Sequence, residues 1–130
     1  MNETPASAAS LLTFLAERGA SLSPLLILTH NHPDPDAMGT GFALAYLAEK
    51  LHGIRCRLAY GGIIGRMENQ VMAKTLRIPM NPLRENDLKR YAHTALIDTQ
   101  PPFHNNPFPP KRRATLILDH HARHPRTQAD

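Results

Sequence analysis

Short apolar runs recur along the chain, and each ends in polar residues. The clearest run, residues 25–28, follows Pro24 and ends at Thr29 and His30. A short continuous apolar run between polar borders is typical of a strand that is buried on both faces in a parallel sheet. Comparable runs predict further strands over residues 54–60, 94–97 and 114–118.

The segments between these runs have helical patterns. Residues 6–18 place apolar side chains three and four positions apart, with Ser7 as a candidate cap and Gly19 just past the end. Residues 37–51 predict a second helix, closed by Gly53. In its first turn, Gly39 and Gly41 would allow a close approach to the sheet.

Two shorter helices are predicted over residues 66–76 and 85–91, with a loop marked by Pro79 and Pro82 between them. Residues 99–113 hold five of the twelve prolines, which predicts either an ordered Pro-rich loop or a mobile flap. The alternation of strands and helices predicts one α/β, Rossmann-like domain, with a mainly parallel sheet and helices on both faces. In such a sheet, ligands bind in the crevice outside the carboxyl ends of the strands.

Composition agrees with a folded domain, since 42% of the residues are hydrophobic and 20% are charged. The net charge of +4 suits an anionic substrate, but a generally basic soluble surface explains it equally well. Cys56 is the only cysteine, which excludes an internal disulfide and a thiolate zinc cluster and favours a reducing cytoplasm. The sequence shows no secretion signal and no apolar run long enough to cross a membrane, so we expect no membrane association.

The first candidate for chemistry is the loop that follows the strand at residues 25–28. It carries one imidazole and two carboxylates, those of His30, Asp34 and Asp36. Carboxylates this close repel each other unless a cation neutralises them. This mixture of oxygen and imidazole ligands suits Mn²⁺ or Mg²⁺ better than structural zinc. The alternative is that Asp34 and Asp36 are turn and cap residues of the next helix.

Two other predicted strands end in similar residues. Asp98 follows the apolar run 95–97, and Asp119, His120 and His121 follow the run 116–118. A single aspartate at a strand end is usually a turn residue. Three strand ends that converge on one edge of a parallel sheet favour a binuclear metal centre instead.

Taken together, residues from about 24 to 125 resemble the first three motifs of the DHH phosphoesterases. The matching elements are His30-x₃-Asp34-x-Asp36, the strand-terminal Asp98 and the triplet Asp119-His120-His121. The resemblance implies two divalent ions, usually Mn²⁺ with Mg²⁺ as the alternative, bound by His30, Asp34, Asp36, Asp98 and His120. It also implies that Asp98 bridges the ions, that His121 acts on the phosphoryl group as a hydrogen-bond donor or general acid, and that Asp119 orients an imidazole.

The resemblance also implies a substrate class. Residues 98–101 and the pair Asn105-Asn106 are most similar to the oligoribonuclease and phosphoadenosine-phosphatase-like branch of the family. Short RNA, cleaved as by an exonuclease, or a 3′-phosphonucleotide is therefore the expected substrate. Exopolyphosphatase or pyrophosphatase activity is the alternative within the family.

The chain ends before the position of the family's fourth motif and C-terminal substrate domain. We therefore expect residues 1–130 to form the N-terminal portion of a DHH domain, with a sheet that is incomplete at the C-terminus. An unprotected sheet edge would favour a homodimer. Two competing hypotheses follow, a non-catalytic nucleotide-binding module and a remnant without a selected function.

Several neighbouring residues have both structural and functional interpretations. Phe103 and Phe108 could stack a base or fix the Pro-rich loop in place. The basic run 111–113 could meet substrate phosphates or simply be solvated. We expect His32 to be a bystander of the metal site.

Overall fold

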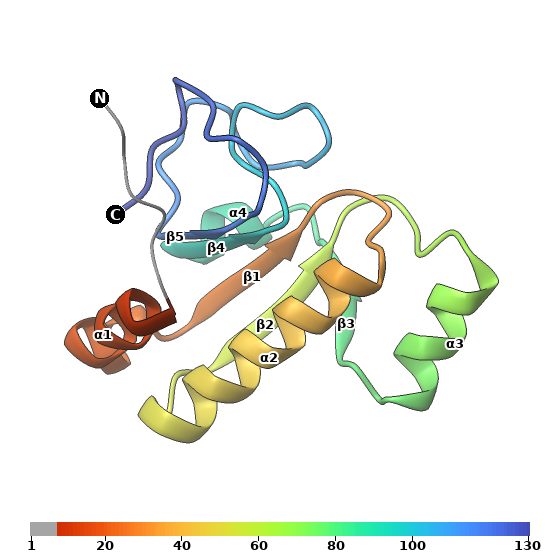
Figure 1. Ribbon diagram of the computed structural model, residues 1–130, viewed down its shortest axis with the longest axis horizontal. Coiled ribbons are helices and arrows are strands. Elements are labelled where there is room, and N and C mark those ends of the chain that lie inside the picture. The colour runs from red at the N-terminus through yellow and green to blue at the C-terminus, as the bar shows by residue number, and fades with distance from the viewer. Residues whose placement is uncertain (1–7) are drawn as a thin grey trace.

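The computed structural model describes residues 8–130, so the proposed cap Ser7 and the start of the first predicted helix lie outside the described residues. The fold is a five-stranded, all-parallel sheet with the order β3-β2-β1-β4-β5, shown in Figure 1. The strands are β1 (Leu25–Thr29), β2 (Cys56–Tyr60), β3 (Met80–Pro82), β4 (His93–Ile97) and β5 (Leu116–Leu118). The helices are α1 (Ala8–Arg18), η1 (Gly19–Leu22), α2 (Pro35–His52), α3 (Met67–Thr75) and α4 (Asp87–Arg90). The predicted α/β, Rossmann-like fold is confirmed.

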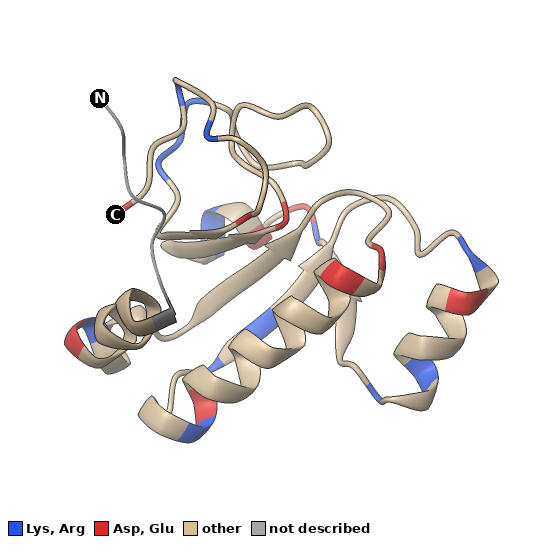
Figure 2. Ribbon diagram, viewed as in Figure 1, with Lys and Arg blue, Asp and Glu red and all other residues tan. Residues whose placement is uncertain are grey.

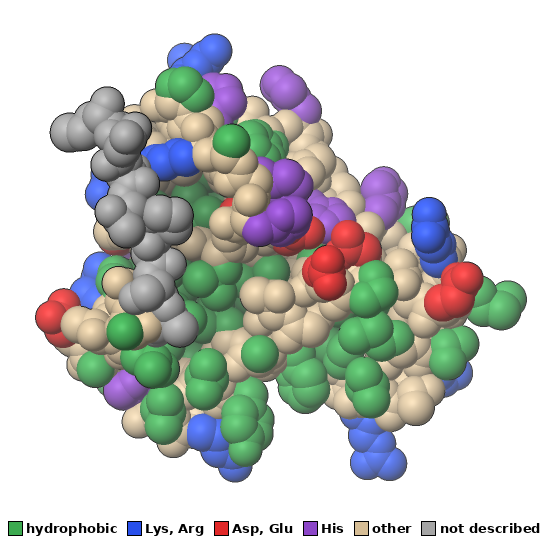
Figure 3. All heavy atoms as spheres, in the orientation of Figure 1, with side chains coloured by type: hydrophobic (Ala, Val, Ile, Leu, Met, Phe, Trp, Pro, Cys, Tyr) green, Lys and Arg blue, Asp and Glu red, His purple; other side chains and the backbone are tan. Residues whose placement is uncertain are grey.

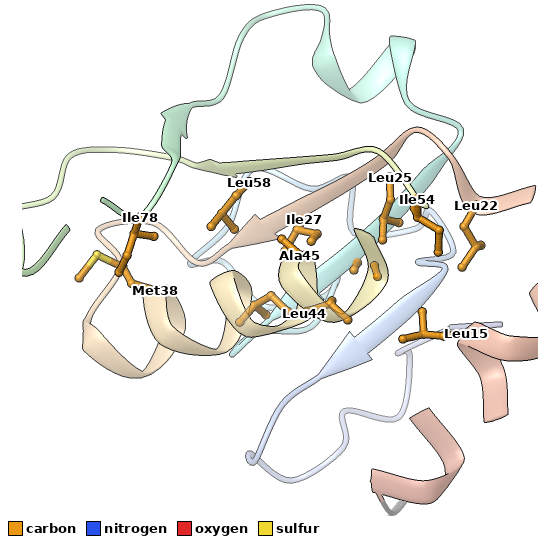
Figure 4. Packing of buried hydrophobic residues seen from close by; sticks show 13 residues of the cluster. Leu15, Leu22, Leu25, Ile27, Met38, Leu44, Ala45, Ile54, Leu58 and Ile78 are labelled. Atoms are coloured by element: carbon orange, nitrogen blue, oxygen red, sulfur yellow. The ribbon is translucent and has the colours of Figure 1, made fainter. Parts of the chain in front are cut away.

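The central strand β1 is buried on both faces, as its continuous apolar run predicts. Ile27 points to the face covered by α1 and α2, where it joins Leu15 and Leu44 in the larger core cluster, shown in Figure 4. Leu26 and Leu28 point to the opposite face, which is covered by α4 and the segment after β4. The sheet therefore has a packed layer on each side.

Helix α2 begins within the first candidate loop, at Pro35. The Oδ1 atom of its N-cap Asp34 accepts a hydrogen bond from the backbone N–H of Ala37 at 3.0 Å, and Pro35 occupies the first turn. A Cβ atom on Gly41 would lie 2.7 Å from Leu58 Cδ1, so α2 packs closely on β2 at this glycine. The sequence also predicts a close approach to the sheet at Gly39. This prediction is wrong, because an added Cβ there would meet no heavy atom within 4 Å.

The main difference from the predicted elements is β3. The prolines at positions 79 and 82 indicate a loop, whereas residues 80–82 pair with β2 as a short edge strand. Pro82 is the last residue of that strand, a position at a sheet edge where a missing N–H is tolerated. Among the described residues, no helix is long and apolar enough to span a bilayer.

Candidate metal centre

The carboxyl ends of β1, β4 and β5 bring the predicted chemistry together around Asp98. Two groups of potential ligands share this residue, and within each group the ligand atoms lie within 4.8 Å of one another. One group consists of His30, Asp34 and Asp98, and the other of Asp98, Asp119, His120 and His121. Figure 2 shows acidic residues where the loops leave this edge, and Figure 3 shows imidazoles beside acidic side chains on the same surface.

Asp98 lies at the junction of β4 and β5 with an unusual backbone conformation. Its φ angle is +59°, and its backbone N–H donates to the carbonyl of Leu118 at 2.8 Å. Positive φ is uncommon outside glycine, although aspartate tolerates it better than most residues. The carboxylate lies beside His30, which follows β1, and His120, which follows β5.

The two oxygens of the Asp98 carboxylate face different imidazoles. Oδ2 lies 3.4 Å from His30 Nε2, whereas Oδ1 lies 2.9 Å from His120 Nε2. The Asp98 side chain is only 13% exposed, and its buried Oδ1 has no hydrogen-bond partner despite the nearby imidazole. A buried carboxylate oxygen without a donor is costly unless a cation compensates its charge. The residues present therefore fit a bound metal ion.

His30 is oriented as a metal ligand would be. Its Nδ1 lies 2.7 Å from the carbonyl oxygen of Asn31, so Nδ1–H must donate, because a carbonyl can only accept. In the neutral ring, the lone pair of Nε2 then faces Asp98 Oδ2 and, at 3.8 Å, Asp34 Oδ1. Three acceptors that face one another fit a shared cation, and the outer hydrogen bond from the imidazole is typical of metal-binding histidines.

The two aspartates of the first loop differ in placement. Asp34 caps α2 and also belongs to the first ligand group, so the helix-cap interpretation and the ligand interpretation both apply to it. Asp36 lies in the first turn of α2 with an exposed side chain, and it belongs to neither ligand group. The structure thus brings together four of the five predicted ligands and leaves Asp36 apart.

The triplet after β5 contains a tightly hydrogen-bonded pair. His121 Nδ1 lies 2.5 Å from Asp119 Oδ1, and the side chain of Asp119 is only 2% exposed. The hydrogen bond to Asp119 and the charge of that carboxylate raise the pKa of His121 above its ordinary value. Burial by itself would raise the pKa of Asp119, but hydrogen bonds from Gln100 and His121 lower it below its ordinary value. Asp119 thus contacts an imidazole, as predicted.

Sequence reasoning missed the role of Gln100. Its side chain is buried and donates through Nε2 to Asp119 Oδ2 at 2.8 Å. The segment that carries it is held by Asn106, whose Nδ2 donates to Thr99 Oγ1 at 2.8 Å and to the Gln100 carbonyl at 2.9 Å. The segment after β4 is rich in amides and prolines. This composition predicted an ordered loop as one of two alternatives, but it did not predict the contact of Gln100 with Asp119.

The other neighbouring residues have structural partners. The backbone N–H of Ile63 donates to His32 Nδ1, and Phe108 is buried in the second core cluster. Arg112 donates to the carbonyls of Leu88 and Tyr91, and Arg113 forms an ion pair with Asp130. Phe103 packs edge-on against His121, with ring centroids 5.9 Å apart. The Pro-rich loop is therefore fixed by its own side chains.

Comparison with known proteins shows a similarity to an archaeal protein. Over 100 residues the chain is 41% identical to the uncharacterized protein MJ1633 of Methanocaldococcus jannaschii, an alignment that covers 76% of the chain. The chain spans about a fifth of the length of that relative, since the alignment covers 20% of it. No protein-family model matches the chain.

Proposed function

We propose that this domain takes part in divalent-metal-dependent hydrolysis of phosphoesters, as its resemblance to the DHH phosphoesterases implies, with short RNA or a 3′-phosphonucleotide as substrate. The observation that carries the proposal is the Asp98 carboxylate, which belongs to both ligand groups and has a buried Oδ1 without a hydrogen-bond partner. A carboxylate shared between two ligand groups is what a bridging ligand of two metal ions requires.

The donor set supports Mn²⁺ or Mg²⁺. His30, Asp34, Asp98 and His120 would hold the metal, with Asp36 as a further ligand implied by the resemblance. Bound ions of this kind supply a hydroxide nucleophile near neutral pH and neutralise charge on the phosphate oxygens.

The chain's own residues supply the remaining parts. His121 has its Nδ1 engaged by Asp119, so its Nε2 is the atom left to face a substrate. Because its pKa is raised, His121 holds a proton at higher pH than a free imidazole and suits the role of hydrogen-bond donor or general acid toward a phosphoryl oxygen.

The test is Mn²⁺ binding by calorimetry, followed in the same samples by hydrolysis of a short RNA, 3′-phosphoadenosine and pyrophosphate. Asp98→Ala should lose Mn²⁺ binding and hydrolysis. The matched control is Glu68→Ala, which removes an exposed carboxylate on α3 and should behave like the wild type. Hydrolysis that is unchanged in Asp98→Ala would refute the proposal.

A non-catalytic nucleotide-binding module is the second candidate, and the position of Asp36 favours it. Asp36 belongs to neither ligand group, so the described residues bring together only part of the ligand set that the resemblance implies. Calorimetry distinguishes the two candidates. Two Mn²⁺ ions per chain, with one site lost in Asp36→Ala, support the hydrolase, whereas one ion and saturable nucleotide binding without product support the binding module.

A further inference from the structure

The buried amide of Gln100 lies at the centre of a hydrogen-bond network behind the DHH triplet. Nε2 donates to Asp119 Oδ2 at 2.8 Å and to the carbonyl of Ala122 at 3.1 Å. Oε1 accepts from the backbone N–H of His124 at 2.8 Å and from Thr127 Oγ1 at 2.7 Å. All four hydrogen-bonding positions of the carboxamide are therefore used.

Only one orientation of this amide satisfies its surroundings. If its oxygen and nitrogen were exchanged, the oxygen would face a carboxylate and a carbonyl, and the nitrogen would face the N–H of His124. Such an arrangement leaves buried polar groups without partners, which is unfavourable. The surroundings therefore fix Gln100 as the donor to Asp119.

The network continues from Asp119 to the candidate site. Oδ2 of Asp119 is occupied by Gln100, and Oδ1 accepts from Nδ1 of His121. That second bond requires the proton of a neutral His121 to be on Nδ1, so that Nε2 is an acceptor in the neutral ring and a donor only after the ring gains a second proton. We propose that Gln100 is a positioning residue that holds Asp119 and thereby fixes the tautomer and orientation of His121.

The catalytic meaning of this inference rests on the proposed function, but the arrangement itself does not. It can be measured on the metal-free protein without a substrate. Its failure is therefore distinguishable from failure of the proposed hydrolysis.

The experiment measures the ring nitrogen chemical shifts of His121 by NMR at a pH above which these shifts no longer change, so that the imidazole is neutral. The wild type should show mainly the Nδ1–H tautomer. Gln100→Glu keeps the shape of the side chain but replaces the donor to Asp119 by an oxygen. The Nδ1–H population of His121 should then fall at least about twofold, since the loss of one hydrogen bond behind Asp119 changes an equilibrium by about that factor or more.

Thr127→Val is the matched control because it removes a hydrogen bond to the same amide but leaves the bond to Asp119 intact. Thr127→Val should lower the free energy of unfolding without changing the His121 tautomer. A purely structural role of Gln100 would instead predict the same behaviour in both variants. Equal changes in both variants, or an unchanged tautomer in a folded Gln100→Glu protein, would overturn the inference.

If Gln100→Glu does not fold, Gln100→Met removes the donor without adding a charge beside Asp119. A measurement on the wild type also tests the inference directly, because the side-chain amide protons of Gln100 should exchange slowly with solvent. Rapid exchange of these protons would overturn the proposed contact.

The metal-loaded protein tests the positioning role and the proposed function together. Hydrolysis that is present in the wild type and lower in Gln100→Glu supports both. A shifted tautomer in a protein without hydrolysis leaves the positioning role intact and counts against the proposed function alone.

Discussion

The two halves of the candidate site are held in place by different kinds of contact. The loop after β1 is fixed by its backbone, since Asn31 N–H donates to the Asn105 carbonyl and His32 N–H to the Gly61 carbonyl. The turn after β5 depends on the side chain of Gln100. The two histidine ligands also differ, because the side chain of His30 is 14% exposed and that of His120 is 74% exposed. The first half is thus organised before a ligand arrives, whereas the second relies on one buried amide.

The largest effect should come from the ligands themselves. His30→Ala removes an imidazole that is partly buried and oriented by its hydrogen bond to Asn31, so we expect it to weaken Mn²⁺ binding more than roughly 100-fold, beyond the usual loss for an outer partner. His120→Ala removes an exposed imidazole and should weaken binding roughly tenfold.

Calorimetric titration of both variants with Mn²⁺ checks this order. Circular dichroism serves as a control that each variant is folded. Equal losses of affinity, or a greater loss for His120→Ala, would show that the first half is no better organised than the second.

A smaller effect is expected where the first loop rests on the turn after β2. Gly62 has a φ angle of +66°, and a Cβ atom there would collide with the ring of His32. Gly62→Ala should therefore lower the free energy of unfolding by about 1–2 kcal/mol, the usual penalty for an alanine in this backbone conformation.

The control is Gly65→Ala, where an added Cβ meets no heavy atom within 4 Å. Its effect on the free energy of unfolding should stay within about 0.5 kcal/mol. Urea denaturation of both variants gives the two values. A Gly62→Ala protein as stable as Gly65→Ala would mean that this turn does not support the first half of the site.

Much of the fold could be predicted because its signals are local. The apolar runs identified β1, β2, β4 and β5, and their parallel arrangement followed from the alternation with helices. The missed strand β3 is three residues long and ends in Pro82, so its pairing with β2 depends on tertiary contact and not on its own propensity.

The candidate site divides in the same way. Three ligands could be recognised because they come within a few residues after a buried strand, namely His30, Asp34 and Asp98. Parallel strands place their carboxyl ends at one edge of the sheet. The contact of Gln100 with Asp119 joins residues that are 19 positions apart and involves no periodic pattern. The partners of Arg112 are similarly distant in sequence, so its structural role was one of two open interpretations.

The last prediction leaves the metal ligands unchanged and concerns β2, the strand that pairs with β1. Cys56 opens β2 and is paired in register with Leu25 of β1. Burial, and to a lesser extent the charge of Glu49, raise the pKa of its thiol to about 12. Since only the thiolate reacts, alkylation of the native protein at about pH 8 should be at least on the order of 100-fold slower than alkylation in guanidinium.

The same shift fixes the sign of a pH effect. The thiol is neutral in both states below its unfolded pKa of about 8.5, so its contribution to stability is fully present there. That contribution is lost as the pH rises from about 8.5 toward the folded value of about 12, because the unfolded state alone gains the thiolate. Rapid alkylation of the native protein at about pH 8 would mean that β2 readily separates from β1. The first half of the site would then lack the rigid support that distinguishes it from the second half.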